Sequence, residues 1–382
     1  MKEINSKNWL TPSNNRYSFQ NVASLFPSIV LGKGDDQSSV LKKNLQPIET
    51  IEFDDLDGKK TIEEMLNTTF TDAFIVLKND EIIFEEYLNK MGPESLHLMN
   101  SVTKSFVGML AGILAENNEL DPNKKVSFYI PEFINTAFAE TTLQNALDMS
   151  AAVKFTEDYN DLLADFWYEA AVVGWRPDLL KKETPENLFQ FALSLKETDQ
   201  RDGERYYYQT VLTNVIAMAI ERATGKRFQD LLEKFLWQKL GPEQDAVIVS
   251  DKTGFPYVGA GMSACARDLA RFGLMLMHDG YYNEKQIVPA SWIKSTRKGD
   301  DGYKKRFSDS DYSLLFPNGH YKNQVWVTDS DTMLCLGIYG QTIYINQRTG
   351  IVVVKFSSHP NPANNDLYVS SLLGIEAISS AI

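Results

Sequence analysis

Strand-like sequence near both ends of the chain, with helical sequence between them, constrains the fold more than any other feature. Residues 73–78 and 82–84 are rich in β-branched and aromatic side chains, and the Asn-Asp pair between them favours a hairpin turn. Residues 340–345 and 351–356 repeat this pattern near the C-terminus. The two hairpins predict an antiparallel sheet that is built from both chain ends.

Three further segments have the periodicity of helices. Residues 211–224 end at Gly225, which is a typical helix stop. Residues 263–277 repeat apolar side chains at helical spacing, and residues 368–382 resemble a closing helix. The long helical sequence between the two hairpins therefore predicts a mainly helical insertion.

The chain is large enough to hold two domains, because it has 382 residues of which 43% are hydrophobic. We expect an α+β fold in which residues 1–115 and 255–382 form a discontinuous sheet domain. Residues 116–254 are expected to form the mainly helical domain. The active site is expected to lie between the two.

The composition excludes several partners. The net charge of −13 argues against nucleic acid and anionic membranes, because a phosphate surface attracts basic patches. The sequence has no stretch of about 20 apolar residues, as a spanning helix needs, and no signal peptide is visible at its start. Cys265 and Cys335 lie in apolar stretches and are expected to be buried free thiols. We therefore expect a cytoplasmic protein.

Residues 101–115 predict a helix that is apolar on nearly all sides, as buried helices are. The exception is a narrow stripe of Ser101, Lys104, Ser105 and Gly108, which share one face because positions i, i+3, i+4 and i+7 stack. A lysine on such a stripe is unusual, because burying an ammonium without compensation is costly.

Ser101 and Lys104 together have the chemistry of a nucleophile and its base. A serine hydroxyl is a weak nucleophile and needs a base within hydrogen-bond reach. Burial lowers the pKa of a lysine, so a neutral amine can accept the serine proton. Free N–H groups at the helix N-terminus would stabilise an oxyanion. The alternative is that Ser101 caps the helix and Lys104 extends past the core to solvent, and the Ser-x-x-Lys pattern alone does not separate the two.

Two motifs resemble those of the serine β-lactamase and penicillin-binding-protein superfamily. Residues 100–106, Asn-Ser-Val-Thr-Lys-Ser-Phe, resemble its nucleophile motif. Residues 206–210, Tyr-Tyr-Tyr-Gln-Thr, precede a helix that ends Glu-Arg-Ala-Thr-Gly and resemble its Tyr-x-Asn or Tyr-x-Ser motif. The resemblance implies that Tyr208 relays protons between the serine–lysine pair and the leaving group, with Thr210 in the Asn or Ser place. A nearby cation would favour a phenolate-like Tyr208.

Residues 337–341, Gly-Ile-Tyr-Gly-Gln, stand where the superfamily has its third motif, Lys-Thr-Gly or His-Thr-Gly. With Tyr339 in the central place and an isoleucine before it, the cation that would bind the carboxylate of a β-lactam or a D-Ala terminus is missing. We expect a backbone N–H near Gly340 or Gln341 to complete the oxyanion hole with that of Ser101.

Where the chain departs from the superfamily pattern, its sequence resembles that of one branch, the 6-aminohexanoate-dimer hydrolase group of carboxylesterase-like proteins. Leu-Asp-Met-Ser at 147–150, Phe-Thr-Glu-Asp-Tyr at 155–159 and Ala-Arg-Asp-Leu-Ala-Arg-Phe-Gly at 266–273 carry this resemblance. It implies that Tyr159 contacts the scissile amide. Trp326 is a further pocket candidate, although packing is an equally good account of each single aromatic residue.

The sequence therefore predicts a cofactor-independent and metal-independent serine hydrolase that forms an acyl-enzyme with a small-molecule ester or amide. It contains no His-Glu-x-x-His, no Cys-x-x-Cys and no phosphate-binding glycine loop. One alternative with the same fold is a β-lactamase or D,D-peptidase, and another is a catalytically silent ligand-binding relative. A homodimer is left open.

Overall fold

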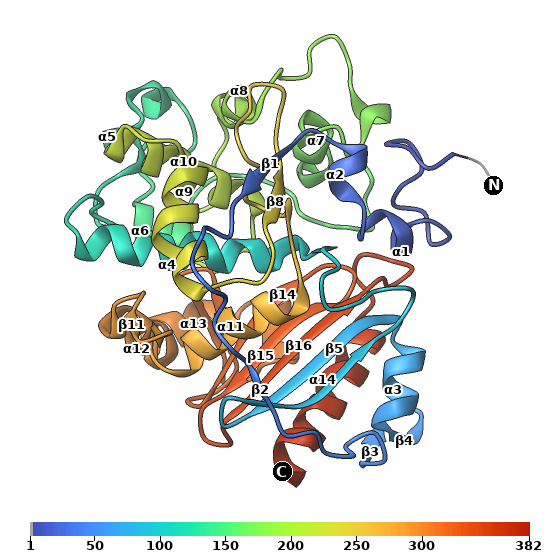
Figure 1. Cartoon of the computed structure of the whole chain (residues 1–382). Helices are drawn as coiled ribbons and strands as arrows, with labels where there is room; N and C mark the ends of the chain where they lie inside the picture. The colour runs from blue at the N-terminus through green and yellow to red at the C-terminus, as the bar shows by residue number, and fades with distance from the viewer. Residues whose placement is uncertain (1–2) are drawn as a thin grey trace.

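The computed structural model describes residues 3–382, and its larger sheet is built from both ends of the chain, as predicted (Figure 1). All neighbouring strands are antiparallel except β2 and β6, which are parallel. In spatial order the strands are β12 (His320–Lys322), β13 (Val325–Val327), β14 (Thr332–Gly337), β15 (Gln341–Asn346), β16 (Ile351–Ser357), β5 (Thr71–Lys78), β6 (Glu81–Tyr87) and β2 (Lys42–Lys43).

Both predicted hairpins are present. Asn79 and Asp80 turn the chain between β5 and β6 with φ of 47° and 70°, the left-handed values that a tight hairpin turn requires. The C-terminal hairpin joins β15 to β16, and β16 then pairs with β5, so that the two chain ends meet in the middle of the sheet. The α+β architecture predicted from this pattern is confirmed, and it agrees with the β-lactamase-like fold that the motif resemblance implies.

Helices cover both faces of this sheet. α11 (Ala266–Met277) packs on β15 and β16, while α14 (Asn365–Ala381) and α3 (Ile62–Thr68) pack together on the opposite face (Figure 1). All seven residues of β16 are buried, which is why its sequence is a nearly continuous apolar run and not an alternating one. The sheet is therefore buried between helices on its two faces.

The helical region lies above the sheet, and α4 crosses the molecule between the two (Figure 1). Every residue of α4 from Thr103 to Leu114 is buried, which confirms the buried helix predicted from residues 101–115. The predicted helix before Gly225 is α9, and Gly225 ends it with φ of 67°. The helices of this region are α4 (Thr103–Glu116), α5 (Val126–Tyr129), α6 (Leu143–Leu147), α7 (Asp165–Val172), α8 (Leu188–Ser194), α9 (Thr210–Thr224) and α10 (Phe228–Leu232).

A second sheet has the order β1 (Ser28–Leu31), β8 (Ala246–Val249), β9 (Met262–Ala264) and β7 (His97–Leu98). It joins strands from both predicted domains, so backbone hydrogen bonds cross the boundary expected near residue 255. It also corrects the helix expected from residue 263, because Ser263 pairs with Val247 and Leu98 across this sheet. The helix begins only at Ala266.

The remaining elements lie at the periphery. They are α1 (Asn15–Ser18), α2 (Val22–Leu25), α12 (Ala290–Lys298), α13 (Asp301–Ser308), β3 (Glu52–Asp55), β4 (Gly58–Thr61), β10 (Tyr281–Tyr282) and β11 (Lys285–Gln286). Cys265 and Cys335 are buried free thiols, as predicted. Over residues 3–382, no helix combines the length and the apolar character needed to cross a membrane.

The small residues on α4 have a structural cause, which is the close approach of the loop before β13. Ser105 Oγ donates to the carbonyl of Gln324 at 2.8 Å. A Cβ at Gly108 would lie 2.0 Å from the carbonyl oxygen of Asn323. Only Ser101 and Lys104 of the stripe are therefore candidates for catalysis. Ser105 and Gly108 allow the loop before β13 to pack against the helix.

Gly108→Ala is expected to destabilise the protein. A methyl group at this contact must displace backbone, which costs about 1–3 kcal/mol or more and outweighs the roughly 1 kcal/mol that alanine gains in a helix. Urea unfolding of the variant should show the loss. Gly92→Ala is the matched control, since nothing lies within 4 Å of a Cβ there. Equal stability of the two variants would contradict the close approach.

Candidate active site

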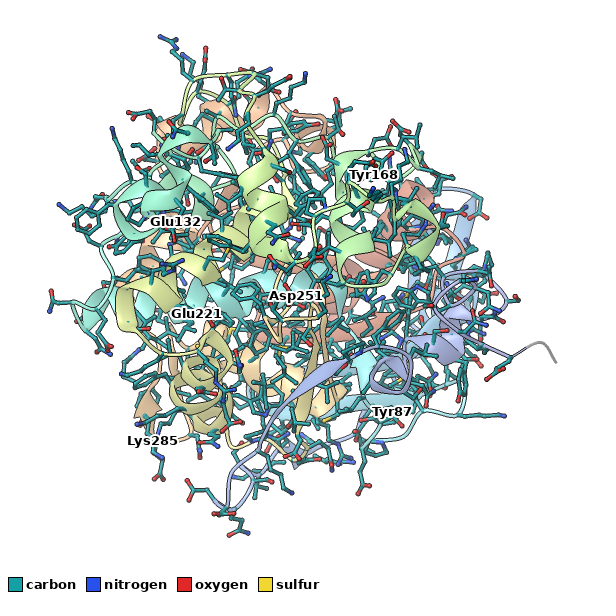
Figure 2. All side chains as sticks on the ribbon, turned by 90° about the horizontal axis from the view of Figure 1, so that it is seen from above. Tyr87, Glu132, Tyr168, Glu221, Asp251 and Lys285 are labelled. Atoms are coloured by element: carbon teal, nitrogen blue, oxygen red, sulfur yellow. The ribbon has the colours of Figure 1, made fainter. Side chains whose placement is uncertain are left out.

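A cavity of about 850 Å³ opens beside Ser101, just before the N-terminus of α4. Its wall is built from segments that are far apart in the sequence, namely residues 157–160, 205–208, 309–316, 336–338 and the first turns of α14. A smaller cavity of about 400 Å³ contains none of the predicted site residues. Its lining includes Glu221 and Asp251, which are labelled in Figure 2. Within residues 3–382, no group of three or more His, Cys, Asp and Glu side chains is arranged to hold a metal ion.

Ser101 and Lys104 lie together at the inner end of the larger cavity. Ser101 belongs to the short 3₁₀ helix Asn100–Val102 and is 8% exposed, so that its hydroxyl is reached from the cavity. Lys104 Nζ lies 2.8 Å from Ser101 Oγ and donates to the carbonyl of Gly259 at 2.6 Å. The alternative in which Lys104 extends to solvent is wrong, because the side chain is only 1% exposed.

Burial lowers the pKa of Lys104 to about 8, although the carboxylates of Glu157 and Glu169 act in the opposite direction. Lys104 forms no ion pair with any carboxylate of the described residues. About a tenth of the lysine is therefore a neutral amine at pH 7, and the neutral share rises with pH. A neutral amine at 2.8 Å can accept the proton of the serine hydroxyl.

Tyr208 completes the group of predicted residues that the structure brings together. Its ring centroid lies 5.0 Å from Lys104 Nζ, and Tyr208 and Ser101 both line the cavity. Burial raises the pKa of Tyr208 well above its ordinary value, so it remains a phenol. The expectation of a phenolate-like tyrosine is therefore wrong, because desolvation outweighs the nearby lysine. Trp326 lines the cavity and stacks on Tyr208, with ring centroids 5.5 Å apart.

The backbone N–H that accompanies Ser101 differs from the expected one. The N–H of Gly340 donates to the Tyr368 hydroxyl at 3.1 Å and is not available to a substrate. Ile338 lines the cavity, and its N–H donates to no acceptor within residues 3–382. A Cβ on the preceding Gly337 would lie 3.0 Å from the Ser101 nitrogen, so the two N–H groups lie at the same end of the cavity.

Three other predicted binding residues do not line the cavity. Gln341 is fully buried, and its amide donates to the carbonyls of Ser357 at 2.6 Å and Tyr339 at 3.1 Å. Tyr339 is 3% exposed and packs edge-on against Phe19. These contacts hold the turn between β14 and β15 in place. Tyr339 and Gln341, which were predicted to belong to the substrate-binding or oxyanion part of the site, therefore do not line the cavity.

Thr210, the third of these residues, holds a carboxylate instead of a substrate. Its backbone N–H and its hydroxyl donate to Glu157 at 2.5 and 2.6 Å, and Thr210 itself is fully buried. Tyr159, which does line the cavity, donates its hydroxyl to the same carboxylate at 2.6 Å. Burial raises the pKa of Glu157, while the Lys104 charge opposes this rise. Sequence reasoning missed Glu157, although the segment that contains Tyr159 also contains it.

A second buried carboxyl reaches Lys104 through a chain of hydrogen bonds. Glu169 Oε1 accepts from the amide of Asn214 at 2.9 Å, and Asn214 Oδ1 accepts from the N–H of Gly259 at 3.1 Å. The carbonyl of Gly259 accepts from Lys104. Burial raises the pKa of Glu169 to about 8. The sequence signal that could have indicated this series of hydrogen bonds is a polar residue among the apolar side chains of a helix, Glu169 in α7 and Asn214 in α9.

Comparisons with known proteins agree with this geometry. The profile of the Beta-lactamase family matches residues 59–372, which is most of the chain and includes the Ser-x-x-Lys segment. The chain belongs to the β-lactamase family. A 6-aminohexanoate-dimer hydrolase of Paenarthrobacter ureafaciens is 31% identical over 357 residues, which cover 93% of this chain and 88% of that protein. The chain is therefore a member of the serine hydrolase superfamily predicted from the motifs.

Solved structures extend the likeness to the fold. A Bacillus anthracis protein provisionally named a 6-aminohexanoate-dimer hydrolase superposes with a TM-score of 0.88 at 28% identity, covering 99% of this chain and 97% of that one. A family VIII carboxylesterase superposes with a TM-score of 0.58 at 13% identity, covering 84% and 96% of the two chains. At this lower identity the likeness shows the fold alone.

Proposed function

We propose that the chain is a serine hydrolase that cleaves short-chain carboxylic esters, and amides as well, through an acyl-enzyme on Ser101. The observation that carries this proposal is the buried Lys104 amine, 2.8 Å from Ser101 Oγ at the end of a cavity of about 850 Å³. Burying a lysine without a carboxylate partner is costly. Lys104 differs from Lys355, which is also buried, because the hydroxyl that Lys104 contacts belongs to Ser101 and lines the cavity. A base for this serine hydroxyl accounts for the placement of Lys104.

In the first half of the reaction the neutral amine of Lys104 takes the proton of Ser101 as Oγ attacks the carbonyl carbon. The negative charge that forms on the carbonyl oxygen is stabilised by the N–H groups of Ser101 and Ile338. The phenol of Tyr208 donates its proton to the leaving oxygen or nitrogen. Tyr208 then recovers a proton from the Lys104 ammonium, so that no net charge accumulates.

In the second half water attacks the acyl-enzyme, with the same groups acting in reverse. Lys104, through Tyr208, accepts a proton from the water, and the N–H groups again hold the oxyanion. Collapse of the tetrahedral intermediate breaks the bond to Ser101 Oγ, which takes the proton back. The acid product leaves, and the serine–lysine pair is restored.

The charges on the cavity wall support uncharged or cationic substrates over carboxylates. Asp158, Asp309 and Asp311 line the cavity and form no ion pair among the described residues. Arg205 is the one basic lining residue of the described chain, and its guanidinium donates to Gln200 and to the carbonyl of Asp199. This balance favours a simple ester or amide over a β-lactam or a peptide terminus, and it agrees with the hydrolase names of the relatives.

The direct test is covalent labelling with a fluorophosphonate probe beside turnover of p-nitrophenyl butyrate and nitrocefin. We expect the folded chain to hydrolyse the ester and to carry the probe on the tryptic peptide that contains Ser101. The heat-denatured chain is the control and should not be labelled. Ester turnover without labelling of Ser101 would overturn the assignment, and the absence of both would favour the ligand-binding alternative. Nitrocefin hydrolysis as fast as that of the ester would favour the β-lactamase alternative.

A further inference from the structure

The turn that carries the Ile338 N–H has a strained backbone. It joins β14 to β15, and within it Tyr339 has φ of 64° and Gly340 has φ of 90°. A non-glycine residue in the left-handed region costs about 1–3 kcal/mol and persists only where its surroundings hold it. The contacts that fix this turn therefore bear directly on the oxyanion donor.

One hydroxyl contacts both ends of the turn. Tyr368, in the first turns of α14, donates its hydroxyl proton to the carbonyl of Gly337 and accepts from the N–H of Gly340 at 3.1 Å. Burial raises the pKa of Tyr368, so the hydroxyl keeps the proton that it donates. The side chain also lines the cavity.

The geometry of the peptide bond connects this contact to the oxyanion hole. The carbonyl of Gly337 and the N–H of Ile338 belong to the same planar trans peptide and point in opposite directions. When Tyr368 holds the carbonyl, it also fixes the direction of the N–H. Asn100 Nδ2 donates to the carbonyl of Ile338 at 3.0 Å, so Ile338 faces the segment that contains Ser101.

Apart from the backbone pairing of Gly337 with Gln341 at the end of the ladder, the other contacts of the turn act on different peptides. The N–H of Tyr339 donates to the carbonyl of Pro362 at 2.9 Å, and the ring of His359 lies under Gly340, where a Cβ would be 2.3 Å from Nε2. Both act on the tip of the turn. Among the described side chains, only Tyr368 bonds the peptide that contains the Ile338 nitrogen.

We propose that Tyr368 is a positioning residue of the oxyanion hole, which aims the Ile338 N–H at the substrate carbonyl by bridging Gly337 and Gly340. The proposal rests on the proposed function, because an oxyanion forms only if Ser101 attacks a carbonyl. It assigns to α14, the last helix of the chain, a part in transition-state stabilisation beyond its packing on the sheet.

Tyr368→Phe is the test, because it removes the bridging hydroxyl and keeps the ring. Since the loss of a whole oxyanion donor costs about 10²- to 10³-fold in kcat, a misaligned donor should cost about 10- to 100-fold, with KM changed by no more than about threefold. The matched control is Tyr282→Phe, which loses a hydroxyl contact to Ser39 at 3.1 Å outside the cavity. Its turnover should stay within about twofold of the wild type.

A boronic acid separates positioning from packing, because its tetrahedral adduct with Ser101 places an oxygen in the oxyanion hole. The inhibition constant of phenylboronic acid should rise in Tyr368→Phe in proportion to the fall in kcat/KM. Unchanged boronate affinity in Tyr368→Phe, or an equal loss of turnover in Tyr282→Phe, would overturn the inference. The proposed function would still stand in that case if the wild type turns over the ester. A wild type without turnover or labelling would refute both. Urea unfolding confirms that each variant is folded.

Discussion

Replacing Ser101 by alanine is expected to lower kcat for p-nitrophenyl butyrate by about 10⁴- to 10⁶-fold, the usual cost of removing an enzyme nucleophile. The hydroxyl is the group that would become the ester of the acyl-enzyme, so without it no acyl-enzyme can form. The fold should be kept, because Lys104 Nζ still donates to the carbonyl of Gly259. Steady-state assays at high enzyme concentration measure the residual turnover of the variant.

Ser105→Ala is the matched control for this variant. Ser105 lies on the same helix, four residues further on, but its hydroxyl donates to the carbonyl of Gln324 and does not line the cavity. It should keep turnover and lose about 1 kcal/mol of stability, the typical worth of one hydrogen bond. Full activity in Ser101→Ala, or loss of turnover in both variants, would refute Ser101 as the nucleophile.

The parts of the site that the sequence predicted are those that local periodicity determines. Ser101 and Lys104 are three residues apart in a continuous helical stretch, the 3₁₀ helix Asn100–Val102 followed by α4. An apolar stretch of this kind has to be buried, so their contact follows from helix geometry. Tyr208 was identified differently, by the resemblance of residues 206–225 to the second motif of the superfamily, which was aligned on the Gly225 that ends α9. The two hairpins likewise follow from turn residues between β-rich runs.

The parts that the sequence could not predict depend on contacts between distant segments. Glu157 and Thr210 meet across 53 positions of the chain, and their hydrogen bonds turn a candidate binding residue into the holder of a carboxylate. Glu169 is linked to Lys104 by hydrogen bonds only through Asn214 and Gly259. Neither charge pattern nor propensity contains this information, because burial of a carboxylate depends on the whole fold.

The oxyanion donor was misplaced for a different physical reason. Residues 338–340 form a turn in which Tyr339 and Gly340 have left-handed φ angles, so the direction of each N–H there does not follow the regular alternation of a strand. The motif indicated the turn at residues 337–341, but the Gly340 N–H is bound by Tyr368 and the Ile338 N–H is free to bind substrate. Only coordinates resolve such a shift.

Lys104→Ala is expected to lower kcat/KM for the ester by about 10³- to 10⁴-fold, since it removes the proposed general base and leaves the hydroxyl of Ser101 in place. In the wild type the base form is the neutral amine, which dominates only above the pKa of about 8 that burial gives Lys104. The kcat/KM of the wild type should therefore rise about tenfold per pH unit below that value and level off above it. Lys104→Ala should lose this dependence.

Two further variants test whether the rise of kcat/KM with pH is caused by Lys104. Glu169 has a pKa of about 8 as well, so Glu169→Gln should keep the rise with pH if the lysine causes it. Lys355 on β16 is a second buried lysine, with a pKa that burial lowers to about 7, but it contacts Ser357 and the carbonyl of Thr69 and not the cavity. Lys355→Met should likewise keep the profile. A limb that vanishes in Glu169→Gln and persists in Lys104→Ala would assign the titration to the carboxyl and refute Lys104 as the base.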